Sequence, residues 1–126
     1  MDALYRDFIL DHYKNPRNFG TLEPHDLEHH DHNPLCGDEM GVHIVVDDGK
    51  IADLRFHGQG CAISQASASI ASEELVGMKV DDIPGLSAEW VFDLLGIDIS
   101  PTRRKCALLS LKVMRGATTG DASWPE

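Results

Sequence analysis

Three cysteines are the residues of this sequence with the clearest chemical potential. Cys36, Cys61 and Cys106 lie far apart in the chain, and no CxxC pair occurs. An odd number of cysteines in a chain of 126 residues argues against a disulfide framework. Free thiols are either inert core residues or groups that bind metal and carry sulfur, so the residues around each cysteine decide between these readings.

The first two cysteines both occur beside glycine. Cys36 lies in a Pro-Leu-Cys-Gly-Asp turn, in which Gly37 lets the backbone fold back, so that the Cys36 thiolate and the Asp38 carboxylate can face one point. Cys61 follows a glycine and directly precedes a predicted helix. The N-terminus of a helix stabilises a thiolate, and this position therefore favours reactive or metal-binding sulfur.

The third cysteine follows a run of positive charge. Cys106 comes directly after Arg103, Arg104 and Lys105, in the first turns of the last predicted helix. Neighbouring cations favour the thiolate form. Any one of the three cysteines alone is more typical of an inert core residue, but this pattern at all three favours a shared chemical role.

Secondary-structure elements must bring these residues together for that role. If the turn after Cys36 and the two helix starts lie at one end of a sheet, three thiolates and the Asp38 carboxylate converge. Such a set fills a tetrahedral zinc site, and its thiolates also suit iron–sulfur chemistry. The spacing of the cysteines alone does not identify a zinc motif.

The hydrophobic periodicity predicts a helix, a small sheet and then further helices. The predicted helices are 2–14, 62–76, 88–95 and 101 to about 115, and the predicted strands are 42–46 and 51–56 around a turn at 47–50. Residues 23–33 are compatible with a strand or a loop. We therefore predict an α+β fold, a small antiparallel sheet of about three strands with helices packed on one face. The chain forms a single domain, 1–126, in which 116–126 is predicted to be a flexible tail.

Composition narrows the class of protein further. Hydrophobic residues make up 42% and charged residues 25%, which is typical of a globular domain. The formal net charge of -10 would repel a phosphate backbone, so no nucleic-acid partner is expected. Apolar runs fall well short of the roughly 20 residues that span a bilayer, and the start of the chain lacks a signal-peptide pattern. We therefore predict a cytoplasmic protein without a membrane partner.

Four motifs resemble the U-type iron–sulfur cluster assembly proteins, the family of IscU, SufU and the NifU N-terminal domain. They are LYRDFILDHYKNPRNFG, NPLCGD, GQGCAISQASAS and RRKCALLSL, and the resemblance covers roughly residues 4–114. It implies the same α+β fold, with Cys36, Asp38, Cys61 and Cys106 as ligands. It also implies zinc in the isolated protein and a transient iron–sulfur cluster, of the [2Fe-2S] type. The implied partners are a cysteine desulfurase and, as recipients, apo iron–sulfur proteins or a downstream scaffold.

Two branches of this family differ around the third cysteine. In the IscU branch a histidine precedes it, after a Leu-Pro-Pro-Val-Lys segment that recruits a chaperone; here Lys105 and the segment DISPTRRK stand instead. A lysine at this place and the match of Arg103 resemble the SufU branch. The segment between Cys61 and Cys106 is nevertheless too short for the insertion that SufU proteins usually carry.

Three hypotheses follow, and we favour a non-enzymatic scaffold that accepts sulfur and binds a nascent cluster. The alternative is a zinc-dependent sulfurtransferase in which Cys36 leaves the metal to accept sulfur and Arg103 holds the freed thiolate. A plain structural zinc domain is the least favoured, because aspartate is an unusual ligand there.

The histidines are weaker candidates for metal binding. His25, His29, His30 and His32 lie in the undecided segment, and His43 and His57 occupy strand positions. We predict that all six are exposed surface residues rather than dedicated ligands.

Overall fold

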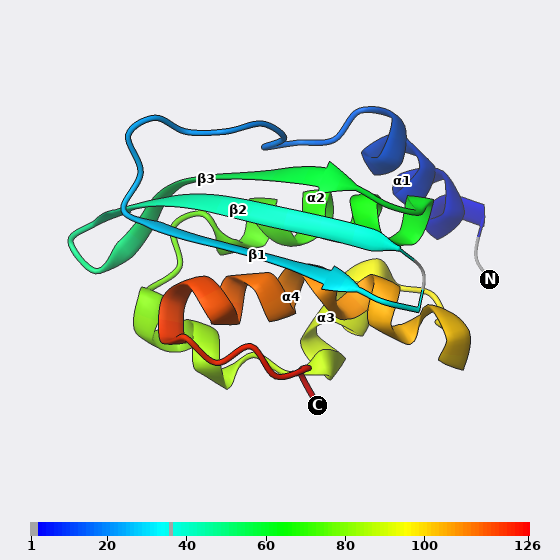
Figure 1. Cartoon of the computed structure of the whole chain (residues 1–126). Helices are drawn as coiled ribbons and strands as arrows, with labels where there is room; N and C mark the ends of the chain where they lie inside the picture. The colour runs from blue at the N-terminus through cyan, green and yellow to red at the C-terminus, as the bar shows by residue number, and fades with distance from the viewer. Residues whose placement is uncertain (1–2, 36) are drawn as a thin grey trace.

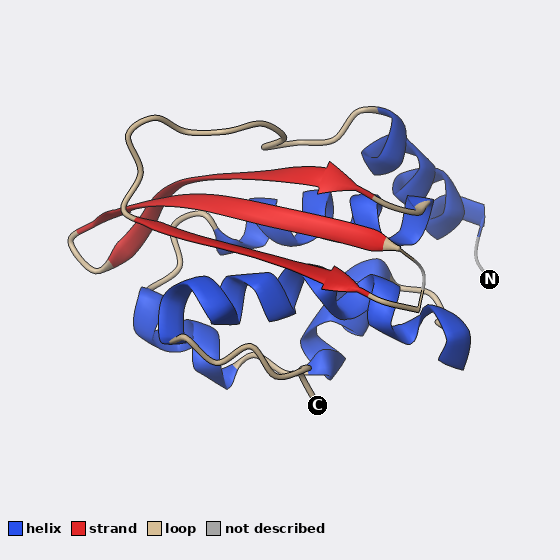
Figure 2. Cartoon of the chain, in the orientation of Figure 1, coloured by secondary structure: helices blue, strands red, loops and turns tan. Residues whose placement is uncertain are grey.

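A three-stranded antiparallel sheet with helices on one face forms the protein (Figures 1 and 2). The computed structural model describes residues 3–35 and 37–126. The elements are α1 (Ala3–Lys14), β1 (Leu27–Asn33), β2 (Asp38–Asp47), β3 (Lys50–Gln59), α2 (Ala62–Leu75), the 3-10 helix η1 (Val80–Gly85), α3 (Ala88–Leu95), the 3-10 helix η2 (Pro101–Arg103) and α4 (Arg104–Thr119). The α+β fold class predicted from the sequence is confirmed.

The sheet has the order β1-β2-β3, and its register places the candidate residues at one end. Asn33 at the end of β1 pairs with Asp38 at the start of β2, and Glu39 pairs with Gln59 at the end of β3. The helices α2 and α4 begin near this same end and run along the inner face of the sheet (Figure 1). Three chain reversals therefore meet at one edge of the molecule.

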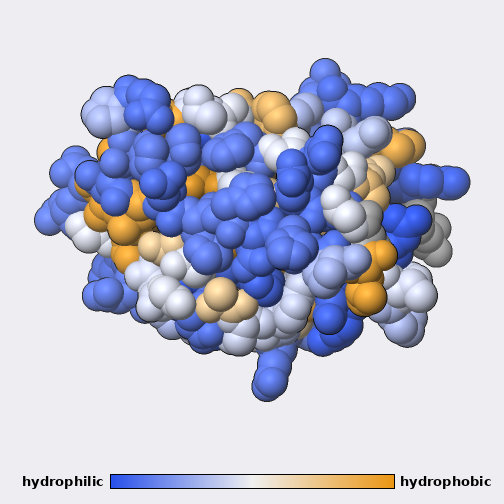
Figure 3. All heavy atoms as spheres, in the orientation of Figure 1, coloured by the Kyte–Doolittle hydropathy of each residue, from blue (hydrophilic) through white to orange (hydrophobic). Residues whose placement is uncertain are grey.

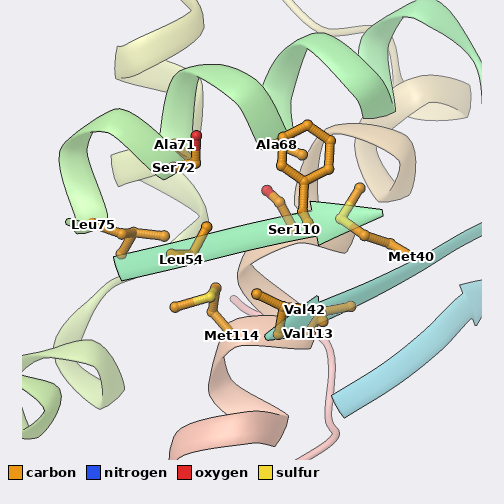
Figure 4. A pocket seen from close by; sticks show the side chains of 11 residues that line it. Met40, Val42, Leu54, Ala68, Ala71, Ser72, Leu75, Ser110, Val113 and Met114 are labelled. Carbon is orange, nitrogen blue, oxygen red and sulfur yellow. The ribbon is translucent and has the colours of Figure 1, made fainter. Parts of the chain in front are cut away.

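The core lies between the sheet and the helices α2 and α4. Alternate residues of β2 and β3 point inward, among them Val42, Ile44 and Leu54, which are almost fully buried. The alanines and serines of α2 are small enough to let this helix approach both the sheet and α4 closely. Figure 4 shows a small, mostly apolar cavity in this layer, with a volume of about 10 Å³. It is no larger than the space of one water, so it is a packing void and not a substrate site.

Helix α4 is held along its length. Lys112 is buried and forms an ion pair with Asp31 of β1. Trp124, beyond the end of the helix, packs against the core, and the Lys105 and Lys112 ammonium groups lie 5.1 and 5.2 Å from the centroid of its ring. These contacts attach α4 to the sheet on one side and to the C-terminal segment on the other.

Several boundaries differ from the sequence-based predictions, and β2 and β3 extend at both ends beyond the predicted strands 42–46 and 51–56. The undecided segment 23–33 forms β1 from Leu27 onward, because its polar residues lie on an edge strand that pairs with β2. The last helix ends at Thr119 and not near Arg115, and Gly120 adopts the left-handed conformation that caps it. In the segment 116–126, predicted as a flexible tail, the first residues thus complete α4, and the Glu126 carbonyl accepts a hydrogen bond from the Ala88 N–H at 3.0 Å. The mobility of this segment stays a prediction.

The surface matches the acidic composition. The face in Figure 3 is mostly hydrophilic, with apolar atoms gathered in small patches. Within residues 3–35 and 37–126, no helix combines the length and the apolar character needed to cross a membrane.

Candidate metal centre

Asp38 is the centre of the site at the end of the sheet. It is the first residue of β2, and its side chain is buried, with only 2% of the residue exposed. Its Oδ1 atom accepts a hydrogen bond from the Cys61 N–H at 2.9 Å. This bond fixes the carboxylate and leaves Oδ2 facing the Cys61 sulfur, 3.9 Å away.

Cys61 occupies the position directly before α2, as the sequence predicted. It is half-buried, and its carbonyl accepts hydrogen bonds from the Ser64 hydroxyl and the Gln65 N–H, at 3.0 and 3.1 Å. Gly60 allows this arrangement, since a Cβ atom there would lie only 2.8 Å from Asp38 Oδ1. The close approach of the β3–α2 junction to Asp38 therefore requires glycine at position 60.

Cys106 reaches the same point from the first turn of α4. It is fully buried, and its Sγ, the Cys61 Sγ and an Asp38 carboxylate oxygen all lie within 4.8 Å of one another. The tetrahedral geometry of zinc, with Zn–S of about 2.3 Å and Zn–O of about 2.0 Å, separates neighbouring donor atoms by about 3.5–3.8 Å. The two sulfurs and the carboxylate are thus close to the spacing that such an ion needs, and their chemistry fits zinc or iron.

The residues predicted for the site also include Cys36 and Arg103. Cys36 lies outside the described residues, although Leu35 and Gly37 belong to the turn that joins β1 to β2. Arg103 ends η2, directly before α4, and its side chain is exposed. Its neighbours in the basic run have aromatic contacts, since the Arg104 guanidinium lies 4.8 Å from the centroid of the Phe92 ring.

Asn33 belongs to the site although sequence analysis did not identify it. It is fully buried, and its Nδ2 lies 3.8 Å from the Cys106 Sγ. Its position directly before Pro34 in the turn motif was the only signal in the sequence, and that signal is equally typical of an ordinary turn residue.

A second group of possible ligands lies on the outer face of the sheet. We call Glu23, His25 and His43 the outer-face cluster, because one ligand atom from each lies within 4.8 Å of the others. The His25 and His43 rings stack with their centroids 3.8 Å apart and their side chains 16% and 12% exposed. The prediction that both are exposed was wrong, because the segment 21–26 crosses the outer face between β3 and β1 and covers them.

Hydrogen bonds occupy the outer-face cluster. The Leu22 N–H donates to His43 Nδ1 at 3.1 Å, and the Leu22 carbonyl is bonded to His25 Nδ1 at 2.8 Å. A neutral His43 that accepts at Nδ1 carries its proton on Nε2, so neither nitrogen offers a lone pair to a metal. The bond to Leu22, together with Glu23 and Glu28, raises the pKa of His25. The two rings therefore hydrogen-bond to the backbone of Leu22 and do not form an open metal site.

A third histidine, His12, is buried between α1 and α2. It is 2% exposed, and its Nδ1 lies 2.7 Å from the Ser69 hydroxyl oxygen, which also accepts the Arg17 N–H at 2.8 Å. Burial lowers the pKa of His12. This network joins the N-terminal helix to α2, away from the sulfur site formed by Asp38, Cys61 and Cys106 in the described part of the chain.

Known proteins match this chain over most of its length. The SufU protein of Bacillus subtilis, named a zinc-dependent sulfurtransferase, is 35% identical, with 90% of this chain and 88% of that protein covered. The iron–sulfur cluster assembly scaffold protein IscU of Thermotoga maritima is 36% identical, with 90% and 92% covered.

The fold is also found in solved structures. A crystal structure from Fervidobacterium islandicum AW-1, described as a candidate iron–sulfur cluster assembly scaffold protein for the SUF system, superposes with a TM-score of 0.77. It is 28% identical, and the match covers 90% of this chain and 95% of that one. The family model of the NifU-like N-terminal domain matches residues 4–120. The chain therefore belongs to the NifU-like N-terminal domain family.

Proposed function

We propose that this protein is an iron–sulfur cluster assembly scaffold that accepts sulfur from a cysteine desulfurase. Cys36, Asp38, Cys61 and Cys106 hold the iron or the nascent cluster, which is the cargo of the reaction, or zinc. The observation that carries the proposal is the convergence of Asp38, Cys61 and Cys106 at one end of the sheet. The similarity to proteins named as IscU scaffolds supports it.

The ligand set suits a protein that must release what it binds. Thiolates are the preferred ligands of iron–sulfur clusters, whereas a carboxylate is a harder ligand and binds such a cluster less tightly. Asp38 would thus be the weakest of the four ligands. Its Oδ1 accepts the Cys61 N–H, and its Oδ2 faces the Cys61 sulfur, where the cargo would bind.

A specific observation supports a second candidate, a zinc-dependent sulfurtransferase. The SufU relative carries that name, and the basic run before Cys106 resembles that branch. Zinc held by these residues would keep the cysteines deprotonated. In the transfer step the Cys36 thiolate attacks the outer sulfur of the desulfurase persulfide, the S–S bond there breaks, and the desulfurase cysteine leaves as a thiolate. Arg103 would help to hold the freed Cys36 thiolate.

The remaining parts of the proposal concern the surroundings of the reaction. We place the protein in the cytoplasm, with a cysteine desulfurase as sulfur donor. Apo iron–sulfur proteins or a downstream scaffold receive the product, and the transient cluster is of the [2Fe-2S] type. The acidic surface, with a net charge of -10, favours a docking partner with basic residues.

An anaerobic assay tests the proposal. The chain is mixed with a cysteine desulfurase, cysteine and ferrous iron, and is followed by visible absorption, intact mass and zinc content. An iron–sulfur chromophore that passes to an apo-ferredoxin supports the scaffold. Retained zinc, a persulfide on Cys36 and no chromophore support the sulfurtransferase. A chain that gains neither iron nor sulfur contradicts both.

A further inference from the structure

Asn33 is a fully buried polar residue that contacts Cys106 of the candidate metal centre. Its side-chain Nδ2 faces the Cys106 Sγ at 3.8 Å, and its Oδ1 accepts the Leu35 N–H at 3.2 Å. Its own carbonyl accepts the Gly37 N–H at 2.9 Å. One residue therefore contacts the third cysteine and both neighbours of the first cysteine in the chain.

The orientation of the Asn33 amide is determined by these contacts. A backbone N–H can only donate, so the atom that faces Leu35 must be the amide oxygen. The NH₂ group must then face the sulfur of Cys106, to which it offers a hydrogen. A buried amide donor aimed at a buried sulfur is a different feature from a simple turn, which needs the oxygen alone.

We infer that Asn33 is a positioning residue that donates a hydrogen bond to the Cys106 thiolate when the site holds metal or cluster. The inference rests on the proposed function, because it concerns the same site. Hydrogen bonds to ligand sulfurs are one of the factors that set the reduction potentials of iron–sulfur clusters, and partners of metal ligands orient them. Asn33 withdraws charge from one sulfur and so distinguishes Cys106 from Cys61.

Two variants separate this role from that of a turn residue. Asn33→Asp keeps an oxygen for the Leu35 N–H but removes the donor to Cys106. Asn33→Ser removes the Nδ2 donor, adds no charge, and leaves a shorter hydroxyl that can accept a local N–H. If Asn33 only stabilises the turn, Asn33→Ser should behave like the wild type, whereas Asn33→Asp also adds a charge beside Cys106.

Cobalt is the probe, because its sulfur-to-metal absorption reports directly on the thiolates. The full chain, freed of metal, is titrated with Co²⁺ alone, and the wild type is compared with both variants. We expect the absorption band to move to longer wavelength in both variants, since a thiolate without its hydrogen bond donates charge more readily. We also expect cobalt affinity to fall by about 10-fold or more, as is usual when a partner of a metal ligand is removed.

The cobalt titration distinguishes a failure of the proposed function from a failure of the role of Asn33. A wild type that binds Co²⁺ without a sulfur-to-metal band overturns the proposed function. A wild-type band that Asn33→Ser leaves unchanged overturns the role of Asn33 alone.

If neither variant folds, NMR of the wild type loaded with ¹¹³Cd decides. A cross-peak between the metal and an Asn33 side-chain amide hydrogen supports the hydrogen bond, and a spectrum without it overturns the inference.

Discussion

Two regions of the molecule each bring three possible metal ligands within 4.8 Å of one another: the sulfur end of the sheet, where Asp38, Cys61 and Cys106 meet, and the outer-face cluster. They differ in whether those ligands can bind a metal. At the sulfur end, hydrogen bonds orient the ligands and leave donor atoms facing one another. In the outer-face cluster, Leu22 engages a nitrogen of each ring. Close ligand atoms are therefore necessary for metal binding but not sufficient, because a donor atom that is already hydrogen-bonded is less able to bind a metal.

The two regions also differ in burial. Asp38 and Cys106 are 2% and 0% exposed, so their positions are set by the core, whereas the side chain of Glu23 is 76% exposed. An exposed carboxylate must lose conformational freedom to bind an ion, and a buried one has already lost it. We therefore expect one metal ion per chain, at the sulfur end.

The largest expected effect comes from removing a ligand at the sulfur end. Cys106→Ser replaces a soft thiolate with a hydroxyl. Zinc affinity should fall by about 100-fold or more, which exceeds the loss typical of replacing a residue that only contacts a ligand. Competition with a chromophoric chelator measures this. Unchanged affinity would mean that zinc binds elsewhere, and the sulfur end would no longer be the favoured metal site.

A second change disturbs the geometry of the sulfur end without removing a ligand. Gly60→Ala places a Cβ against Asp38, so we expect the free energy of unfolding to fall by about 1–3 kcal/mol, as in other overpacked sites, with weaker zinc binding. Gly85→Ala is the matched control, because a Cβ there meets no atom within 4 Å. Urea denaturation of both variants checks this, and equal losses would show that Gly60 has no special role.

The third prediction concerns His12, whose pKa is lowered by burial from the ordinary value of 6.5. The unfolded chain then binds the proton more readily than the folded chain, so stability should decrease as the pH falls below about 6.5 and should not depend on this group above it. Unfolding of wild type and His12→Gln at pH 8 and pH 5.5 tests the sign. A wild type that loses no more stability than the variant would contradict it.

The smallest effect is expected at the outer-face cluster, where the linkage has the opposite sign. The pKa of His25 is raised by its bond to Leu22, so the stability it contributes is fully present below pH 6.5 and is lost as the pH rises through the raised value. His25→Gln should therefore destabilise slightly, more at pH 5.5 than at pH 9, and zinc stoichiometry should stay at one. A loss of zinc in this variant would show that the outer-face cluster is a metal site after all.

Much of this arrangement could be predicted from local sequence patterns. The alternation in β2 and β3, the turn at 47–50, the helix after Cys61 and the left-handed Gly96 after α3 all follow from short-range rules, and the structure has each of them. The sequence left the meeting of Asp38, Cys61 and Cys106 conditional on the turn after β1 and the two helix starts lying at one end of the sheet, and the structure brings these three residues together there.

The features that sequence analysis missed all depend on contacts between residues far apart in the chain. The burial of His43 depends on a segment that crosses the sheet from β3 to β1, and β1 itself is a polar strand that only its pairing with β2 reveals. The contact of Asn33 with Cys106 joins residues from opposite halves of the chain. No local periodicity reports on such contacts.

The attachment of α4 has a consequence for the route of the cargo. Cys106 is enclosed, and the helix that carries it is tied down by the Asp31–Lys112 ion pair and by Trp124. Cys61, in contrast, is half-open to solvent. Of the two cysteines that the structure describes, Cys106 is thus the enclosed and fixed one, and we expect iron and sulfur to reach the site from the side of Cys61.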